Sequence, residues 1–171
     1  VGSNVFFTAT TAAAGLELWK TDGTAGGTVM VKDILAGATG SSISGLTNVG
    51  GTLFFAANDG TNGVELWKSD GTTAGTVMVA NINTVAAANS SPANLTAIGS
   101  TVYFSATNGT TGIELYKSDG TTTSIVLDIN TGSGSSSPTA LFNWSGSLYF
   151  RATTTAAGAE LWKSDGTPGG T

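Results

Sequence analysis

Four glutamates occupy one position of a repeated octet. Glu17, Glu65, Glu114 and Glu160 each open a copy of Glu-Leu-Trp-Lys-Ser-Asp-Gly-Thr or a close variant, and the copies begin 48, 49 and 46 residues apart. Paired carboxylates carry out glycoside hydrolysis when one of them has a raised pKa and acts as the acid. Every copy has the same Glu, however, so no copy is specialised as acid or base. We therefore expect a repeated structural hydrogen bond, or an ion pair with a nearby Lys, and no catalytic residue.

The octet ends in Asp-Gly-Thr, a sequence suited either to a turn or to calcium. A short carboxylate can accept hydrogen bonds from backbone N–H groups two residues on, while Gly supplies positive φ. Calcium wants about six to eight oxygen ligands, and only Asn58-Asp59-Gly60, with Glu65 beyond, approaches that density. We predict structural turns and no metal site. The turn residues are Asp22, Gly23, Asp70, Gly71, Asp119, Gly120, Asp165 and Gly166.

The third position of the octet is aromatic in every copy. Trp19, Trp67, Tyr116 and Trp162 occupy it. Exposed aromatic rings would suggest stacking on sugars, as in a lectin. Alternation with apolar Leu along a strand instead favours packing between sheets.

Trp144 lies outside the octet, in a slot that holds Val49 and Ile98 in the two preceding copies. A Trp in a position otherwise occupied by aliphatic residues can fill a narrow centre or cap an end of the fold. Trp144 is accordingly the one aromatic residue that the sequence singles out for ligand contact.

Composition excludes several classes of function. The chain has no His and no Cys, which removes disulfides, ordinary zinc or copper sites and the commonest general base. A net charge of -5 with six scattered basic residues argues against nucleic-acid binding. No apolar run approaches the ~20 residues that span a bilayer. We predict no cofactor, no nucleic-acid partner and no membrane insertion.

The segments around the octet read as short strands. In the third copy they cover residues 93–99, 101–107, 113–118 and 124–129, with turn residues between them. No segment keeps an apolar i, i+3, i+4, i+7 pattern, so no helix is expected. Counted along the chain, the copies contain three, four, four and three strands.

The central strands are apolar on both faces, as in residues 53–57, Leu-Phe-Phe-Ala-Ala. A sheet with one face in water would alternate between apolar and polar residues, so these sheets are expected to be covered on both sides. Repeated four-stranded antiparallel sheets of this length are typical of the blades of a β-propeller. A β-solenoid is the alternative, but its coils are usually shorter.

We therefore predict an all-β, propeller-like array of about three and a half blades. Residues 1–171 form a single repeat domain with units at about 1–48, 49–97, 98–143 and 144–171, the last incomplete. The first copy lacks its first strand and the last copy lacks its fourth. The chain begins inside a repeat, which suggests a piece of a longer polypeptide. Further repeats or sister chains would then cover the end sheets.

The octet, followed by Thr73-Ala74-Gly75-Thr76 and an apolar strand, resembles the ELWxxDGT tandem repeats of large secreted or surface bacterial proteins. The resemblance covers essentially the whole chain. Tyr116 replaces Trp, Thr21 replaces Ser, and the third copy has a final hairpin two residues shorter. The resemblance implies an extracellular or cell-surface location and a propeller-like fold, and it implies no established activity.

The leading hypothesis is a non-enzymatic structural or adhesive module of a bacterial surface or filamentous assembly. Its partners would be copies of itself or further repeats of the same polypeptide, because unpaired strands at both ends can accept neighbours. A carbohydrate-binding, lectin-like propeller is the alternative, and carbohydrate is then the partner. A hydrolase-type propeller is a third hypothesis, favoured only if one carboxylate differs from its copies.

Overall fold

The structure, a computed structural model, describes residues 1–171 and contains four antiparallel sheets. The first sheet has three strands and the next two have four each. The fourth has three, so the strands are distributed as the sequence predicts. The strands of the first two sheets are β1 (Val5–Thr11), β2 (Gly15–Thr21), β3 (Val29–Lys32), β4 (Ser44–Val49), β5 (Thr52–Asn58), β6 (Val64–Ser69) and β7 (Val77–Ala80). Those of the last two are β8 (Ala93–Ile98), β9 (Thr101–Thr107), β10 (Ile113–Ser118), β11 (Thr123–Leu127), β12 (Thr139–Trp144), β13 (Ser147–Thr154) and β14 (Gly158–Ser164).

The one helical element is the short 3₁₀ turn η1 (Pro168–Gly170). The structure has no helix with the length and apolar character needed to cross a membrane.

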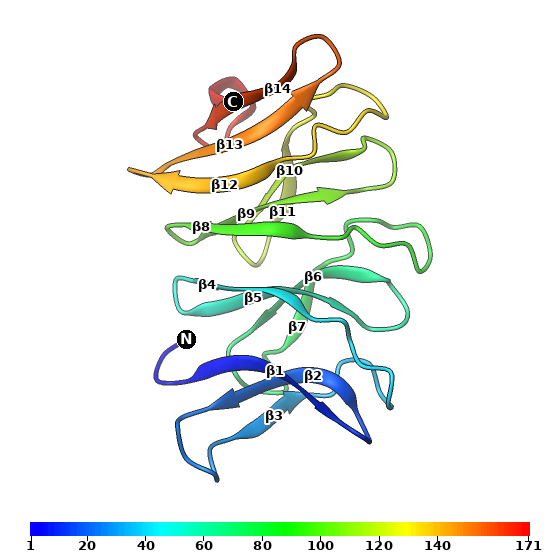
Figure 1. The fold of residues 1–171 in the computed structure, drawn as a ribbon, viewed down its shortest axis with the longest axis vertical. Coiled ribbons are helices and arrows are strands. Elements are labelled where there is room, and N and C mark those ends of the chain that lie inside the picture. The colour runs from blue at the N-terminus through cyan, green and yellow to red at the C-terminus, as the bar shows by residue number, and fades with distance from the viewer.

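The four sheets lie one upon the next in chain order (Figure 1). The arrangement is open, and no closed propeller is present. Three separate apolar clusters join the sheets in succession, one between each adjacent pair. The two middle sheets are therefore covered on both faces, as their two-sided apolar strands predict, and Phe55 and Phe104 are completely buried.

Cross-strand register explains why Trp67 and Tyr116 each face the sheet before their own. Within the second sheet Phe55 pairs with Trp67, and within the third Phe104 pairs with Tyr116. Directly paired residues point to the same face of a sheet. Phe55 and Trp67 accordingly pack together against Leu18 of the sheet before them.

The sheets do not share the boundaries of the sequence units. The boundaries near 49, 98 and 144 fall at the ends of β4, β8 and β12, within the hairpins that join these strands to β5, β9 and β13. The sheets are instead separated by linkers at 33–43, 81–92 and 128–138. The difference arises because a period in the sequence fixes the repeat length but not which strands share hydrogen bonds.

Candidate functional sites

Three of the four octet glutamates hold the linker that leaves their own sheet. Glu65 is completely buried and accepts hydrogen bonds from the backbone N–H groups of Ile82 (2.9 Å) and Asn83 (3.4 Å). It also accepts the hydroxyl of Ser90 at 2.6 Å. Glu17 and Glu114 bind their own linkers in the same way. These three glutamates form structural hydrogen bonds and not the alternative, an ion pair with Lys.

The serine bound by each glutamate also ties the linker to the following sheet. The Ser41 carbonyl accepts the N–H of Asn58 (2.8 Å), and the Ser90 carbonyl accepts the N–H of Thr107 (3.0 Å). A carboxylate on one sheet therefore fixes the segment that places the next sheet. Each of these repeats therefore contains the hydrogen bonds that position the next sheet.

Sequence patterns alone do not single out the serines that these glutamates bind. Ser41, Ser90 and Ser136 are completely buried, although they lie in Ser-, Thr- and Gly-rich loops that look irregular. The available signal was their recurrence 24, 25 and 22 residues after the glutamate that each one binds.

Burial raises the pKa of Glu65 and of Glu114, although hydrogen bonds from Ser90 and Ser136 act in the opposite direction. A raised carboxyl pKa is a property of general acids. Here, however, the oxygens are directed at backbone N–H groups and a serine hydroxyl inside the protein. Glu160, in the fourth sheet, is exposed.

The Asp-Gly-Thr turns carry local hydrogen bonds from the residues that follow each aspartate. Asp70 Oδ1 accepts the Thr72 hydroxyl (2.7 Å) and the Thr72 N–H (2.8 Å), and these bonds hold the pKa of Asp70 below its ordinary value. Asp22 and Asp165 repeat the arrangement. Asp119 accepts the N–H groups of Thr121 and Thr122 instead, because its hairpin is shorter.

The loop with the densest acidic and amide groups is closed on itself. Asp59 accepts the N–H groups of Thr61 (2.9 Å) and Asn62 (2.7 Å), and its second oxygen accepts the Asn62 side-chain amide. Glu65 is occupied by its own linker. No three acidic side chains come together as a set of metal ligands in the structure.

The octet lysines join successive sheets. Lys20 Nζ donates to the carbonyl of Gly71 (2.7 Å), Lys68 Nζ to that of Gly120 (2.7 Å) and Lys117 Nζ to that of Gly166 (2.8 Å). Each acceptor is the glycine of the Asp-Gly-Thr turn in the next sheet. Lys163 of the fourth sheet is exposed and lies 5.9 Å from the ring centre of Tyr149.

We expect Lys68→Met to lower the free energy of unfolding by about 1–2 kcal/mol, the range for a partly buried hydrogen bond to a charged donor. Lys163→Met provides the matched control, and in dilute solution it should change stability by less than about 0.5 kcal/mol. Urea denaturation followed by tryptophan fluorescence measures both. Equal losses in the two variants would mean that the contact between sheets contributes nothing.

Three of the four octet aromatics pack between sheets, whereas Trp19 lies on the face of the first sheet that no sheet precedes. Trp67 lies in the cluster that joins the first two sheets, Tyr116 in the next, and Trp162 against the last. Their polar atoms have no hydrogen-bond partner: the indole N–H groups of Trp19, Trp67 and Trp162 and the hydroxyl of Tyr116 are all unpaired. The rings are therefore used for their apolar surface.

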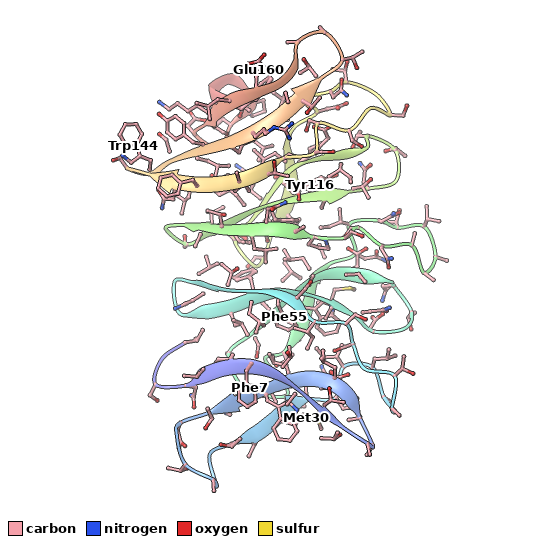
Figure 2. All side chains as sticks on the ribbon, in the orientation of Figure 1. Phe7, Met30, Phe55, Tyr116, Trp144 and Glu160 are labelled. Carbon is pink, nitrogen blue, oxygen red and sulfur yellow. The ribbon has the colours of Figure 1, made fainter.

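Trp144 is 61% exposed, on the outer side of the fourth sheet (Figure 2). Its ring centre lies 5.6 Å from that of Tyr149 at an interplanar angle of 58°, so the two form a tilted aromatic pair. Val49, in the same slot of the second sheet, is buried against the third sheet. Trp144 is exposed because no sheet follows the fourth in the structure.

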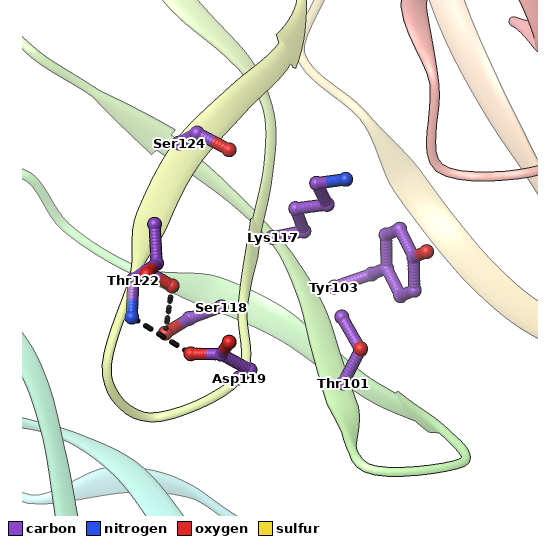
Figure 3. Close-up of a pocket in the computed structure, with 7 residues that line it drawn as sticks. All are labelled: Thr101, Tyr103, Lys117, Ser118, Asp119, Thr122 and Ser124. Carbon is purple, nitrogen blue, oxygen red and sulfur yellow. Dashed lines mark hydrogen bonds between the residues drawn. The ribbon is translucent and has the colours of Figure 1, made fainter.

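A polar hollow of about 390 Å³ lies beside the shortened hairpin of the third sheet (Figure 3). It is lined by Thr101, Tyr103, Lys117, Ser118, Asp119, Thr122 and Ser124. Its charged groups are already engaged, because Lys117 binds the Gly166 carbonyl and Asp119 caps its own turn. Ser118 donates to the Thr122 carbonyl at 3.0 Å. The hollow leaves few polar atoms to bind a ligand.

A second hollow, of about 300 Å³, lies between the second and third sheets. Asn81, Asn108 and Tyr116 contribute to its lining, and the Tyr116 hydroxyl is buried without a protein partner. Tyr stands here where the other copies have Trp. A departure from the repeat, Tyr in place of Trp, thus contributes a polar atom to the lining of this hollow.

No protein-family model matches the chain, and no curated protein matches it. Among solved structures, puromycin hydrolase is similar with a TM-score of 0.64 and 14% identity, over 96% of this chain and 26% of that chain. A mutant of puromycin hydrolase complexed with PGG gives a TM-score of 0.64 and 14% identity, over 95% and 25% of the two chains.

A structure from a study of two prolyl endopeptidases gives a TM-score of 0.61 and 10% identity, over 96% of this chain and 23% of that chain. The chain thus spans about a quarter of the length of the structures it matches. At this level of identity the likeness concerns the fold alone, and the sheets of this chain form a propeller-like, all-β arrangement.

Proposed function

We propose that this chain is a non-enzymatic structural or adhesive module of a bacterial extracellular or cell-surface assembly, built from blades of the propeller type. The observation that carries the proposal is the use made of the recurring side chains. Glutamates bind linkers, lysines bind the next sheet, and aspartates bind their own turns. In the first three copies the glutamates and lysines, which could otherwise do chemistry, hold one sheet on the next, and the aspartates cap their own turns in all four copies.

The placement of the proposed module outside the cell rests on the resemblance to the ELWxxDGT repeats and on composition. Low charge and abundant Thr, Ser and Gly give a surface with few ionic groups. Antibody labelling of intact producing cells tests this part of the proposal. Labelling that appears only after the cells are lysed would contradict it.

The structural role is tested by the behaviour of the purified chain in solution. Negative-stain electron microscopy and sedimentation at increasing concentration should reveal rings or fibres made of many copies. Assays with peptidase, esterase and glycosidase substrates should show no turnover above buffer. Turnover that is abolished by one carboxylate substitution, such as Glu160→Gln, would refute the non-enzymatic assignment.

A lectin-like propeller is the second candidate function, favoured by the exposed Trp144 and its aromatic pairing with the half-buried Tyr149. Aromatic faces of this kind bind sugars by stacking, because one face of a sugar ring is apolar. A glycan array and fluorescence titration test it. Binding that Trp144→Ala abolishes would favour this function over the structural one, and no binding on the array would exclude carbohydrate as the partner.

A further inference from the structure

Two positions of the repeat are buried wherever a sheet has a neighbour and exposed where it has none. The octet leucines Leu18, Leu66 and Leu115 are each 0% exposed, whereas Leu161 in the fourth sheet is 76% exposed. Each of the first three lies in the cluster that joins its sheet to the following one. Leu161 therefore presents the same contact surface without a partner.

The first sheet shows the complementary exposure. Leu53, Val102 and Leu148 are the second residues of β5, β9 and β13; they are at most 3% exposed and pack against the preceding sheet. Val5 is the equivalent residue of the first copy and is 65% exposed. Phe7 and Met30 belong to this same sheet at the opposite end of the stack from Trp144 (Figure 2).

The outer face of the fourth sheet carries larger apolar side chains than the same positions of the second and third sheets. Phe142 stands where the earlier copies have Thr47 and Thr96, and Trp144 where they have Val49 and Ile98. Phe142 and Trp144 are both exposed. With Leu161 they make an apolar face on a sheet that ends the stack, and an apolar patch of this kind marks an interaction site.

We propose that the first sheet of a second copy of this chain docks on the fourth sheet of this one, a proposal that rests on the structural role above. The contact would continue the interface that already joins the sheets within one chain. The occupant is a second copy because its first sheet carries the residues that fill this position elsewhere. Val5, Phe7 and Trp19 correspond to Leu148, Phe150 and Trp162, which pack on the third sheet.

Polar contacts fix the register of this docking. Each lysine that has a following sheet donates to the glycine carbonyl of the next turn. Lys163 would therefore bind the carbonyl of Gly23 in the second copy. Charge also agrees, because Arg151 and Lys163 are exposed cations on one face and Asp22 is an exposed anion beside Gly23 on the other.

The contact joins two different faces, so it is heterologous. Contacts of this kind produce closed rings where the rotation closes and filaments where it does not. Either product contains the same sheet-on-sheet interface. A variant in one face therefore stops growth without removing the other face from the molecule.

Sedimentation velocity of Leu161→Asp and Val5→Asp, alone and mixed, tests the proposal. Both residues are exposed, so both variants should keep the circular dichroism spectrum and unfolding transition of the parent chain. Each variant alone should be a monomer at concentrations where the parent chain assembles. An equimolar mixture should form a heterodimer, because Val5→Asp keeps an intact fourth sheet and Leu161→Asp keeps an intact first sheet. Val85→Asp is the control, since Val85 is 63% exposed in a linker, away from both faces; it should assemble like the parent chain.

The outcomes separate this inference from the structural role. Assembly of the parent chain that persists in both variants would overturn the docking surface and leave the structural role standing. A parent chain that is monomeric at all concentrations would overturn the docking surface, as would a mixture that stays monomeric. Enzymatic turnover or cytoplasmic labelling, together with the expected heterodimer, would overturn the proposed function alone.

Discussion

Glu65→Ala should lower the free energy of unfolding by about 3–5 kcal/mol, because it removes the acceptor of a buried hydrogen-bond network. The N–H groups of Ile82 and Asn83 and the hydroxyl of Ser90 are directed at this carboxylate. Alanine leaves these donors in a site that is closed to water. The linker then loses the contact that places the third sheet on the second. Urea denaturation monitored by tryptophan fluorescence measures the loss.

Glu160→Ala is the matched control, since Glu160 has the same place in the repeat and is exposed. We expect it to change stability by less than about 0.5 kcal/mol.

The pH dependence of the free energy of unfolding gives an independent check on Glu65. Burial raises the folded-state pKa of Glu65. The pH-dependent part of its contribution to the free energy of unfolding is therefore complete below the ordinary Glu pKa, and this part is lost as pH rises through the raised value. The stability difference between the parent chain and Glu65→Ala should therefore be larger near pH ~4 than near pH ~7. Equal effects of the two alanine variants, or a difference that grows with pH, would contradict this account.

The strands were predictable because their pattern depends on near neighbours. Residues 53–57 are apolar at every position, which identifies a strand covered on both faces, and turn residues mark its ends. The count of strands in each sheet follows from the same reasoning. The boundaries of the sheets do not follow from this pattern. A hairpin such as the one between β4 and β5 is defined by strand pairing rather than by the repeat period.

The partners of the octet side chains were not predictable, because they depend on contacts between distant segments. The glutamate alone indicates a structural hydrogen bond, but its partner Ser90 lies 25 residues away in a loop of unremarkable composition. The lysine partner is more distant, since Lys68 binds a carbonyl 52 residues later. Backbone carbonyls leave no trace in a sequence.

The place of Trp144 shows how a correct observation in the sequence can leave its meaning open. The sequence shows that Trp144 occupies the slot of Val49 and Ile98. Its exposure follows from the absence of a sheet beyond the fourth in the structure, which no local pattern records. The apolar face around it is consistent with a ligand site and with a docking surface, and the structure favours docking because the same slot is an interface elsewhere.

A glycine lies two residues before each octet glutamate, and we expect the substitution Gly112→Ala to destabilise the protein. Gly112 has a φ of +70°, and a Cβ added there would lie 2.3 Å from the carbonyl oxygen of Gly134 in the linker. The substitution should cost about 1–2 kcal/mol for the left-handed backbone and about 1–3 kcal/mol more for overpacking against the linker. The linker would have to move away from the strand, and the hydrogen bonds of Glu114 to Ser136 would be strained with it.

Gly158→Ala separates these two costs. Gly158 has a similar φ of +76°, and a Cβ added there has no atom within 4 Å. Both variants carry the backbone cost, so the difference between their unfolding free energies reports the contact with the linker alone. We expect Gly112→Ala to be less stable than Gly158→Ala by about 1–3 kcal/mol. If the two variants were equally stable, the linker would not press on its sheet, and the glutamate would be holding a segment that is free to move.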